Sequence, residues 1–444
     1  MPTNTYSGAG DWPPIINQLV TLVGGIDNVD MGVYTALKGF PDPQKNPLRD
    51  QGIKDGTTFL NWVASFLNWV PSDTTDSTYV YDMLCIFYYV FDQVPLSTDQ
   101  TEITPASENQ PLKALSAWMV TFAQQMGQFM NTTSSFSQEA FASFQNSPLY
   151  NTGESESPDG SAYQTFNQFF GRRLATPRPV SSPGDNKVVV YPADSRFDAA
   201  FTIDANDQSD PGTDQIVPPT VPVKGLPWDI TALLNGSQYA STFAGGVWSH
   251  SFLCTYNYHR LHAPVSGTVV EARVIQGAAY LQVKADPETG TFKKRRYIGK
   301  HSGKHKGEAH MEAVDGAGYQ FLQARGLFVI DTSTSPDGDI GLVAVLPIGM
   351  AQVDSVVPLV RAKSDITQPT FPFLVQKGDP LAYFQFGGSD IIVVFQKKAG
   401  LNATSFFPKP DPTTAPLDPE KQWSRYGQPL AVAAPQESRQ SHNG

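Results

Sequence analysis

Between residues 15 and 150 the apolar residues recur at the spacing of an α-helix. In residues 58–70 they form one stripe, and the polar residues Asn61, Ser65 and Asn68 lie off it. Pro71 predicts the end of this helix. The stripe contains no Lys or Arg to meet lipid headgroups, so we favour packing in a protein core over docking on a membrane.

Two more buried helices are predicted from the same pattern, over residues 81–91 and 112–130. We therefore predict a helical N-terminal domain over residues 15–150, after a flexible N-terminus of residues 1–14. Residues 151–161, with the sequence NTGESESPDGS, are polar and rich in turn formers, which predicts a linker.

Beyond the linker, short β-branched runs alternate with glycine and proline turns, which is typical of strands. The predicted strands cover residues 187–191, 267–274, 280–283, 341–346 and 391–395. Two weakly similar pieces, residues 263–277 and 373–388, have the turn-then-strand pattern of barrel-sandwich modules. The predicted fold class is α+β, with the helical domain followed by a β-rich, barrel-sandwich-like domain over residues 162–409. Residues 410–444 form a proline-rich polar tail, which we expect to be poorly ordered.

Charge and composition narrow the class of protein. The 444 residues include 31 basic and 42 acidic side chains, a net charge of −11, which disfavours binding to nucleic acid or to anionic membranes. The chain has no apolar run long enough to span a bilayer, and its N-terminus lacks the pattern of a secretory signal. Cys85 and Cys254 are expected to be free thiols in a reducing compartment. These features predict a cytoplasmic protein.

A basic island interrupts this acidic chain at residues 293–310, KKRRYIGKHSGKHKGEAH. A solvated loop between strands explains it most simply; a patch for an anionic group or a weak metal site are the alternatives. Elsewhere, His259 and His262 lack the spacing and the glutamate of a zincin motif, so we predict no metal site.

Three residues of the β-rich half have the composition of a nucleophilic triad: Asp194, His262 and Ser389. Each also has an ordinary explanation, as a turn cap, a core histidine and the end of a hairpin. Gly388 favours the chemical interpretation, because a serine that attacks the carbonyl of its own preceding residue needs a sharply bent backbone there. A neutral histidine could take the proton of the hydroxyl, and a buried aspartate could hold the imidazole in the required tautomer.

Such an attack would make an ester, and β-elimination would then break the chain. The serine would become a dehydroalanine and finally a pyruvoyl group, a ketone built into the protein.

The motifs around these residues resemble the phosphatidylserine decarboxylase family of pyruvoyl-dependent enzymes. In order along residues 163–396 they are YQTFNQFFGRRL with a following Arg-Pro, YPADSR, VKG with a later Leu-Leu, YNYHRLHAPVSG, a Lys-Gly-Asp turn and FGGSD. The helical half is similar to a soluble branch that includes fungal L-tryptophan decarboxylases, through residues 115–136 and 144–150. The resemblance identifies residues 162–409 as the catalytic domain.

The resemblance implies cleavage between Gly388 and Ser389, into chains 1–388 and 389–444. It implies that Asp194 and His262 activate Ser389, which becomes the pyruvoyl cofactor, and that His259 lies near it and assists substrate binding or proton transfer. The sequence departs from the family at Asp390, where Thr or Ser is usual, and this puts self-cleavage in question.

The predicted function is decarboxylation of a free amino acid through a Schiff base, with L-tryptophan as the first candidate. One alternative is decarboxylation of phosphatidylserine to phosphatidylethanolamine. Others are an unprocessed binding module of the same fold, and a serine hydrolase acting through Asp194, His262 and Ser389. The expected assembly is a two-chain heterodimer made by self-cleavage; its further oligomeric state stays open.

Overall fold

The computed structural model describes most of the chain. The described residues are 6, 11–75, 79–205, 218–223, 225–281, 283–286, 290–292, 298–300, 309–311, 318–349, 356–359, 372–407 and 423–435. Residues 1–5 and 7–10 of the predicted flexible N-terminus lie outside them, as do residues 293–297 and 301–308 of the basic island. The described residues 11–14 of that segment are ordered, since Trp12 is buried and Pro14 begins the first helix.

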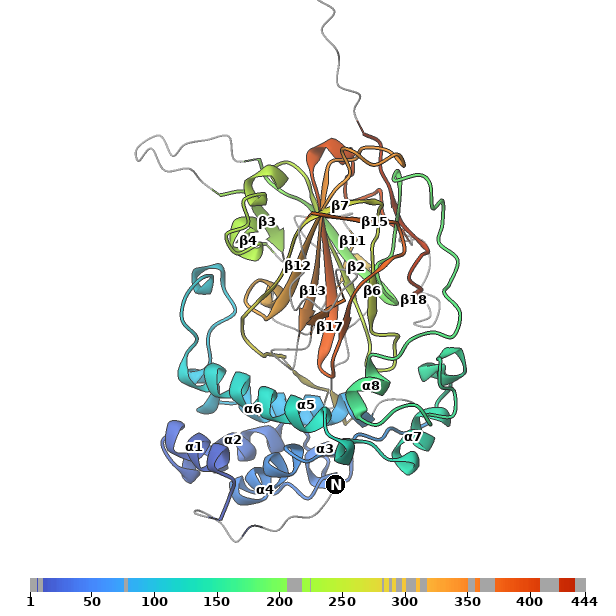
Figure 1. Ribbon diagram of the computed structural model, residues 1–444. Helices are drawn as coiled ribbons and strands as arrows, with labels where there is room; N and C mark the ends of the chain where they lie inside the picture. The colour runs from blue at the N-terminus through green and yellow to red at the C-terminus, as the bar shows by residue number, and fades with distance from the viewer. Residues whose placement is uncertain are drawn as a thin grey trace, which may run out of the picture.

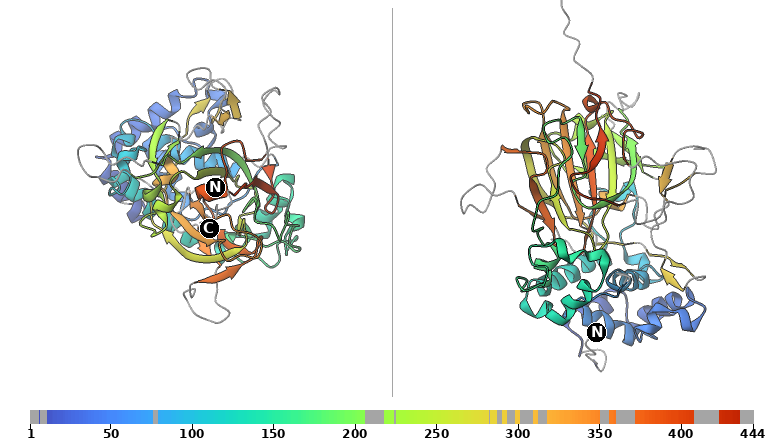
Figure 2. Two further views of the ribbon diagram at one scale, coloured as in Figure 1. Left: turned by 90° about the horizontal axis from the view of Figure 1, so that it is seen from above. Right: turned by 90° about the vertical axis from the view of Figure 1, so that its right-hand side faces the viewer.

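Helices form a layer at one end of the molecule, below a body of strands (Figure 1). Its helices are α1 (Pro14–Leu22), α2 (Ile26–Lys38), α3 (Pro47–Asp50), α4 (Gly56–Phe66), α5 (Tyr79–Phe91), α6 (Ala114–Met130), α7 (Gln138–Gln145) and α8 (Phe166–Phe170). A further short helix, α9 (Ile230–Leu233), belongs to the β-rich part. The side view in Figure 2 shows the same division, so the α+β prediction is confirmed.

The three predicted helices correspond to α4, α5 and α6. The α4 helix begins with a capping box between Asp55 and Thr58 and ends at Phe66, before the predicted residue 70. The turn that follows α4 is tighter than a turn of α-helix: the N–H of Trp69 donates to the carbonyl of Phe66, three residues earlier. The chain leaves the helical conformation here because Pro71 disfavours that conformation in the residue before it. The apolar stripe is buried, as core packing requires.

An eight-stranded antiparallel sheet forms the centre of the β-rich part, in the order β15-β7-β12-β13-β17-β5-β2-β18. Its strands are β2 (Ser195–Thr202), β5 (Val247–Phe252), β7 (Gly267–Ile275), β12 (Arg325–Asp331), β13 (Leu342–Gly349), β15 (Phe373–Val375), β17 (Gly388–Phe395) and β18 (Trp423–Ser424). Within the described residues β15 and β18 are the edges, so this sheet is not a closed barrel.

Smaller sheets surround it. A three-stranded sheet contains β14 (Val356–Pro358), β16 (Pro380–Phe384) and β6 (Arg260–His262). Two-stranded pairs join β1 (Val188–Val190) to β19 (Pro429–Val432), β3 (Thr220–Val223) to β4 (Leu226–Asp229), β8 (Ala285–Asp286) to β9 (Thr291–Phe292), and β10 (Ile298–Lys300) to β11 (Ala309–Met311).

Two predictions differ from the structure. The described part of residues 280–283 is not in a strand; the N–H of Val283 instead donates to Asp92 beyond the end of α5, at 2.9 Å. Part of the predicted tail, residues 423–435, is ordered, because β18 and β19 pair with β2 and β1. The rest of the tail from residue 410 lies outside the described residues.

The helical layer and the large sheet share one hydrophobic core. The α5 helix is buried along almost its whole length, and aromatic rings from both parts meet beside it. Trp69, after α4, lies with its ring 5.8 Å from that of Phe386, which precedes β17. The sheet segment around residue 388 is therefore in direct contact with the helical layer.

Candidate active site

The backbone at the predicted cleavage position is bent. Gly387 has φ +113°, a conformation that favours glycine strongly. In the pairing of β17 with β13, Gly388 lies opposite Gly349 and Asp390 opposite Ile348, so Ser389 is the extra residue of a β-bulge. Bulges redirect the chain and are common beside active sites. The side chain of Ser389 lies outside the described residues.

His262 is a buried, neutral imidazole at the end of β6. Its Nδ1 lies 2.7 Å from the carbonyl oxygen of Gly378, and its Nε2 lies 3.1 Å from the hydroxyl of Tyr258. Burial lowers its pKa to about 4, with a smaller contribution from nearby Arg260. Because a carbonyl can only accept, Nδ1 carries the proton and Nε2 is the acceptor.

Among the described residues, Asp194 binds groups other than this imidazole. Its carboxylate pairs with the guanidinium of Arg178 and accepts the backbone N–H of Tyr426 at 3.0 Å. The ring of Tyr426 stacks on His262, with centroids 3.8 Å apart and planes 5° apart. Within the described residues the contact between Asp194 and His262 therefore runs through Tyr426, and the Gly378 carbonyl fixes the tautomer.

His259 is fully buried next to the segment that leads to residue 388. Its ring stacks on Phe170 at 3.9 Å, and its carbonyl accepts the N–H of Phe384 at 2.8 Å. Burial and, to a smaller extent, Arg172 lower its pKa to about 3, so this imidazole is also neutral.

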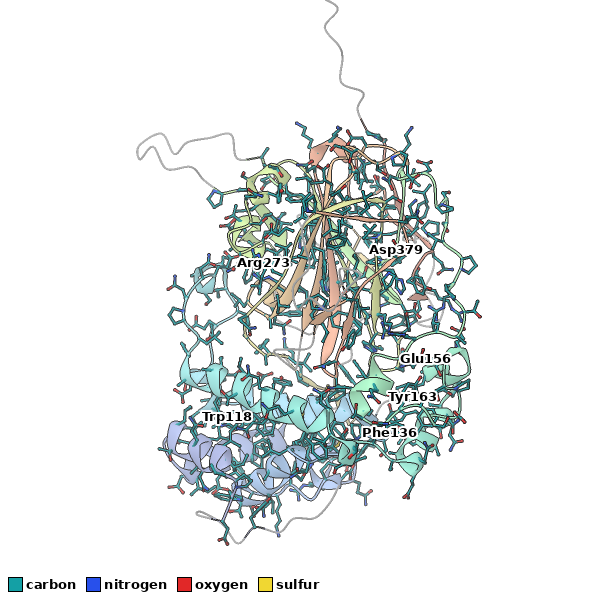
Figure 3. All side chains as sticks on the ribbon, in the orientation of Figure 1. Trp118, Phe136, Glu156, Tyr163, Arg273 and Asp379 are labelled. Carbon is teal, nitrogen blue, oxygen red and sulfur yellow. The ribbon has the colours of Figure 1, made fainter. Side chains whose placement is uncertain are left out.

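A cavity of about 1030 Å³ opens beside His262, where the helical layer meets the strands. Glu156 and Tyr163 from the segment around α8 and Asp379 from the turn before β16 line it, and all three are labelled in Figure 3. Its basic lining residues are Arg173 and Arg260. A cavity with this lining can take a ligand that has both polar and apolar parts.

Sequence reasoning missed a third buried histidine. His250 of β5 lies between the carboxylates of Asp198, on β2, and Asp390, on β17. It also did not identify Tyr258 or Tyr426 as contacts of His262. The segment VWSHSF offers no signal for the first of these, because its polar residues resemble the solvent-facing positions of a strand although both faces of β5 are buried.

Among the described residues, no group of three His, Cys, Asp or Glu side chains is arranged to hold a metal ion. The same residues contain no helix with the length and apolarity needed to cross a bilayer.

Comparison with known proteins identifies the family. Residues 166–410, more than half of the chain, match the sequence profile of phosphatidylserine decarboxylase. The chain is 29% identical to phosphatidylserine decarboxylase proenzyme 3 of Schizosaccharomyces pombe over 58% of its own length, but covers only 21% of that relative.

Two other relatives are covered more fully. Identity is 25% to the phosphatidylserine decarboxylase proenzyme of Anaeromyxobacter sp., over 64% of this chain and 84% of the relative. It is 26% to decarboxylase iboD of Amanita muscaria, over 60% of this chain and 69% of the relative. The chain therefore belongs to the phosphatidylserine decarboxylase family, whose members are pyruvoyl-dependent carboxy-lyases.

Proposed function

We propose that this chain cleaves itself between Gly388 and Ser389 and then decarboxylates a free amino acid with an aromatic side chain, with L-tryptophan as the first candidate. Cleavage would give two chains, residues 1–388 and 389–444. The names of two relatives include the word proenzyme, which supports an inactive precursor that matures by cleavage.

The backbone around Ser389 fits the formation of a pyruvoyl group. Gly387 and the bulge allow the sharp bend that an attack on the Gly388 carbonyl requires. His262 is neutral, and its Nε2 has the lone pair that a general base needs. In this proposal Asp194 acts at a distance, by holding Tyr426 against the imidazole.

A bound pyruvoyl group would supply a ketone that condenses with an amine and withdraws the electrons released as CO2 leaves. The protein's part is to bind, orient and desolvate the substrate. His259, neutral and stacked on Phe170, is suited to one hydrogen bond with the substrate and not to carrying a charge. Apolar surroundings favour loss of a carboxylate, because its charge disperses as CO2 forms.

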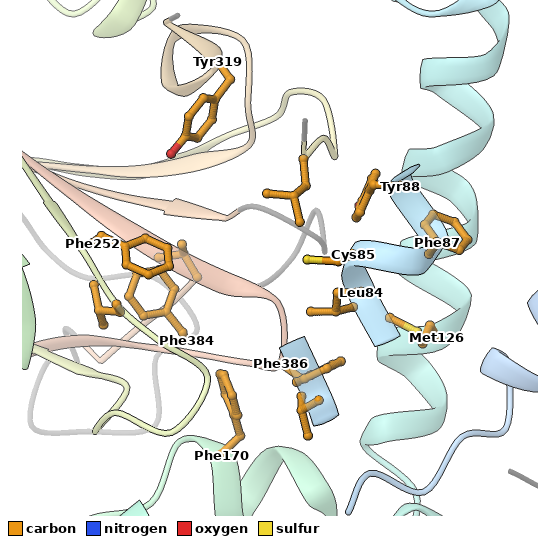
Figure 4. Close-up of a cluster of buried hydrophobic side chains, with 14 of the residues drawn as sticks. Leu84, Cys85, Phe87, Tyr88, Met126, Phe170, Phe252, Tyr319, Phe384 and Phe386 are labelled. Carbon is orange, nitrogen blue, oxygen red and sulfur yellow. The ribbon is translucent and has the colours of Figure 1, made fainter. Parts of the chain in front are cut away.

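The observation that carries the choice of substrate is the aromatic surrounding of Phe386, two residues before Gly388. This fully buried ring lies 5.8 Å from Trp69, 5.3 Å from Phe166 and 5.5 Å from Phe170. In Figure 4, Leu84, Cys85 and Tyr88 of α5 and Met126 of α6 belong to the same cluster of buried side chains as this ring. An apolar cluster of this kind next to the reacting residue favours an aromatic side chain over a charged headgroup.

The cavity beside His262 favours a second candidate, phosphatidylserine. The side chain of Arg260 donates to the carbonyl of Gly171 at 2.8 Å and lies over the ring of Tyr383 at 5.2 Å, which holds its positive charge at the cavity wall. A guanidinium in such a position attracts a phosphate group.

Self-cleavage is tested by intact mass and gel electrophoresis of the purified protein. We expect two chains for the wild type, with a blocked N-terminus on the smaller, and one chain for Ser389→Ala and for His262→Ala. Ser333→Ala, at an exposed turn, is the matched control and should give two chains. A single full-length wild-type species after long incubation would support the unprocessed binding module. Labelling of Ser389 by a fluorophosphonate would support the hydrolase.

Substrate choice is tested by CO2 release from L-tryptophan, L-phenylalanine and L-alanine, and from vesicles that contain phosphatidylserine. We expect release from the two aromatic amino acids, and none from Ser389→Ala with any substrate. Turnover of the vesicles alone would overturn the aromatic substrate and support the second candidate.

A further inference from the structure

A buried group of charged side chains lies beside residue 389 and has no part in the proposed cleavage. The Nδ1 of His250 is 3.0 Å from a carboxylate oxygen of Asp198, and its Nε2 is 3.3 Å from one of Asp390. The three side chains are 6%, 3% and 0% exposed, so they are removed from solvent.

The groups around His250 favour its charged form. Burial alone would lower its pKa, but the carboxylates of Asp390 and Asp198 outweigh burial and raise the pKa to about 9. Among the residues that the structure describes, Arg196 is a further charged group of this region, 3.9 Å from Asp198. His250 also has uncharged neighbours: the amide of Gln320 lies 3.3 Å from Nε2, and the indole of Trp248 stacks on the ring at 5.7 Å.

Asp390 has a second anchor. The hydroxyl of Tyr319 donates to the same carboxylate oxygen that faces His250. On the backbone, Asp390 is paired on both sides, with Ile348 of β13 and Phe252 of β5. Side chain and main chain together fix this residue to three neighbouring segments.

Asp390 becomes important once the chain is cut. Before cleavage, residue 389 is held by covalent bonds in both directions. After cleavage it is a chain end, and Asp390 is the first residue that still ties it to the sheet. Small displacements of a reacting group cost large factors in rate, so an anchor at this place matters more for turnover than for the cut itself.

We propose that Asp390, held by His250 and Tyr319, is a positioning residue that keeps the new chain end in register for decarboxylation. This inference rests on the proposed function, because it assumes that Ser389 becomes the pyruvoyl group. It assigns to His250 and Tyr319 a role in the reaction without contact with the substrate.

The test separates cleavage from turnover in Asp390→Asn, with Asp339→Asn as the control. Asp339 pairs with Lys398 at the surface, outside the buried group around His250. For Asp390→Asn we expect cleavage within about threefold of the wild type and a kcat lowered about tenfold or more, with little change in KM. The control should match the wild type in all three. Tyr319→Phe keeps the ion pair and should lower kcat by a smaller factor, which preserves the test if Asp390→Asn does not fold.

A pH profile, measured at pH values where circular dichroism shows each protein to be folded, separates positioning from a purely structural role. The wild-type kcat should fall as the pH rises through about 9, where His250 loses its proton, and His250→Gln should lack this fall. The inference would be overturned if Asp390→Asn lost cleavage and turnover equally, or if it kept the wild-type turnover. It would also be overturned if His250→Gln showed the same alkaline fall in kcat. If the wild type never cleaves, the proposed function is overturned together with this inference. If the wild type cleaves and decarboxylates, and the variants do so at the wild-type rates, only the positioning role of Asp390 is overturned.

Discussion

Asp194 and His262 are joined through a third residue, Tyr426, whose N–H binds the carboxylate and whose ring stacks on the imidazole. Within the described residues, the arrangement differs from a triad in which the carboxylate binds the imidazole directly. Here a backbone carbonyl, that of Gly378, sets the tautomer, and the aspartate fixes the position of the stacked ring.

Asp194→Asn should therefore slow self-cleavage without abolishing it. The amide cannot pair with Arg178 as a carboxylate does, and the lost charge pairing should cost on the order of 2 kcal/mol of stability. We expect a slower appearance of the two chains on a gel and a lower urea midpoint. Glu154→Gln removes the other partner of Arg178 and is the control: it should lower stability but leave the cleavage rate near that of the wild type.

The rate of self-cleavage should be nearly constant between pH 5.5 and 7.5. His262 has its pKa lowered to about 4, so it stays neutral and able to accept a proton across this range. A histidine of ordinary pKa would lose about tenfold of its neutral form over the same interval. The measurement is the time course of cleavage of freshly translated protein at several pH values, and a tenfold decline toward pH 5.5 would contradict the assigned base.

The free energy of unfolding should be greatest near pH 6.5. The lowered pKa values of His259 and His262 give a contribution that is complete above about 6.5, the unfolded value, and is lost as the pH falls toward 4. The raised pKa of His250 has the opposite effect. It contributes on the order of 3 kcal/mol to the free energy of unfolding below about pH 6.5, and this contribution is lost as the pH rises through 9.

Urea titrations at pH 5, 6.5 and 9.5 measure both sides of this maximum. His250→Gln should reduce the alkaline decline, to which the raised pKa of Glu108, about 8, also contributes, and leave the acid decline in place. A variant that declines as steeply as the wild type above pH 6.5 would show that other groups cause the loss.

Leu84→Ala should weaken binding of an aromatic substrate. Leu84 belongs to the same buried cluster as Phe386 in Figure 4, and an apolar contact of this size changes binding about tenfold. We expect a higher KM for L-tryptophan, a smaller change for L-alanine if it reacts, and normal self-cleavage. The control is Ile86→Ala, on the opposite face of the buried helix α5. It should lower stability about as much as Leu84→Ala does, without changing the preference among substrates.

Gly387→Ala should slow self-cleavage because its backbone conformation is strained for any residue with a Cβ. The cost is roughly 1–2 kcal/mol. Gly25 has the same φ of +113°, with open space around a Cβ, and lies at the start of α2, so Gly25→Ala is a matched control. Both variants should be less stable, but only Gly387→Ala should accumulate uncut chain. Equal cleavage rates in the two would show that the bend at Gly387 is not needed.

Much of the fold could be predicted because its signals are local. The apolar spacing of α5 and α6 and the β-branched runs of β13 and β17 are long enough to define both the type of element and its buried side. Residues 280–283, YLQV, are also mostly apolar, but Val283 binds Asp92 of the helical layer, which no local pattern reports.

The contacts of the site could not be predicted because they join distant, short segments. Tyr426 belongs to a proline-rich stretch whose two-residue strand β18 has too few positions to show a period. Asp198 and His250 lie in strands that are buried on both faces. In the sequence, however, their polar side chains resemble the solvent-facing positions of a strand that is buried on one face only.

The strand pairings also determine what breaking the chain would leave behind. Residues 389–444 supply β17, which lies between β13 and β5, and the ordered segment that pairs with β1 and β2. A nick before residue 389 would thus yield two interwoven polypeptides that share one sheet. They should copurify without a covalent link, and only a denaturant should separate them.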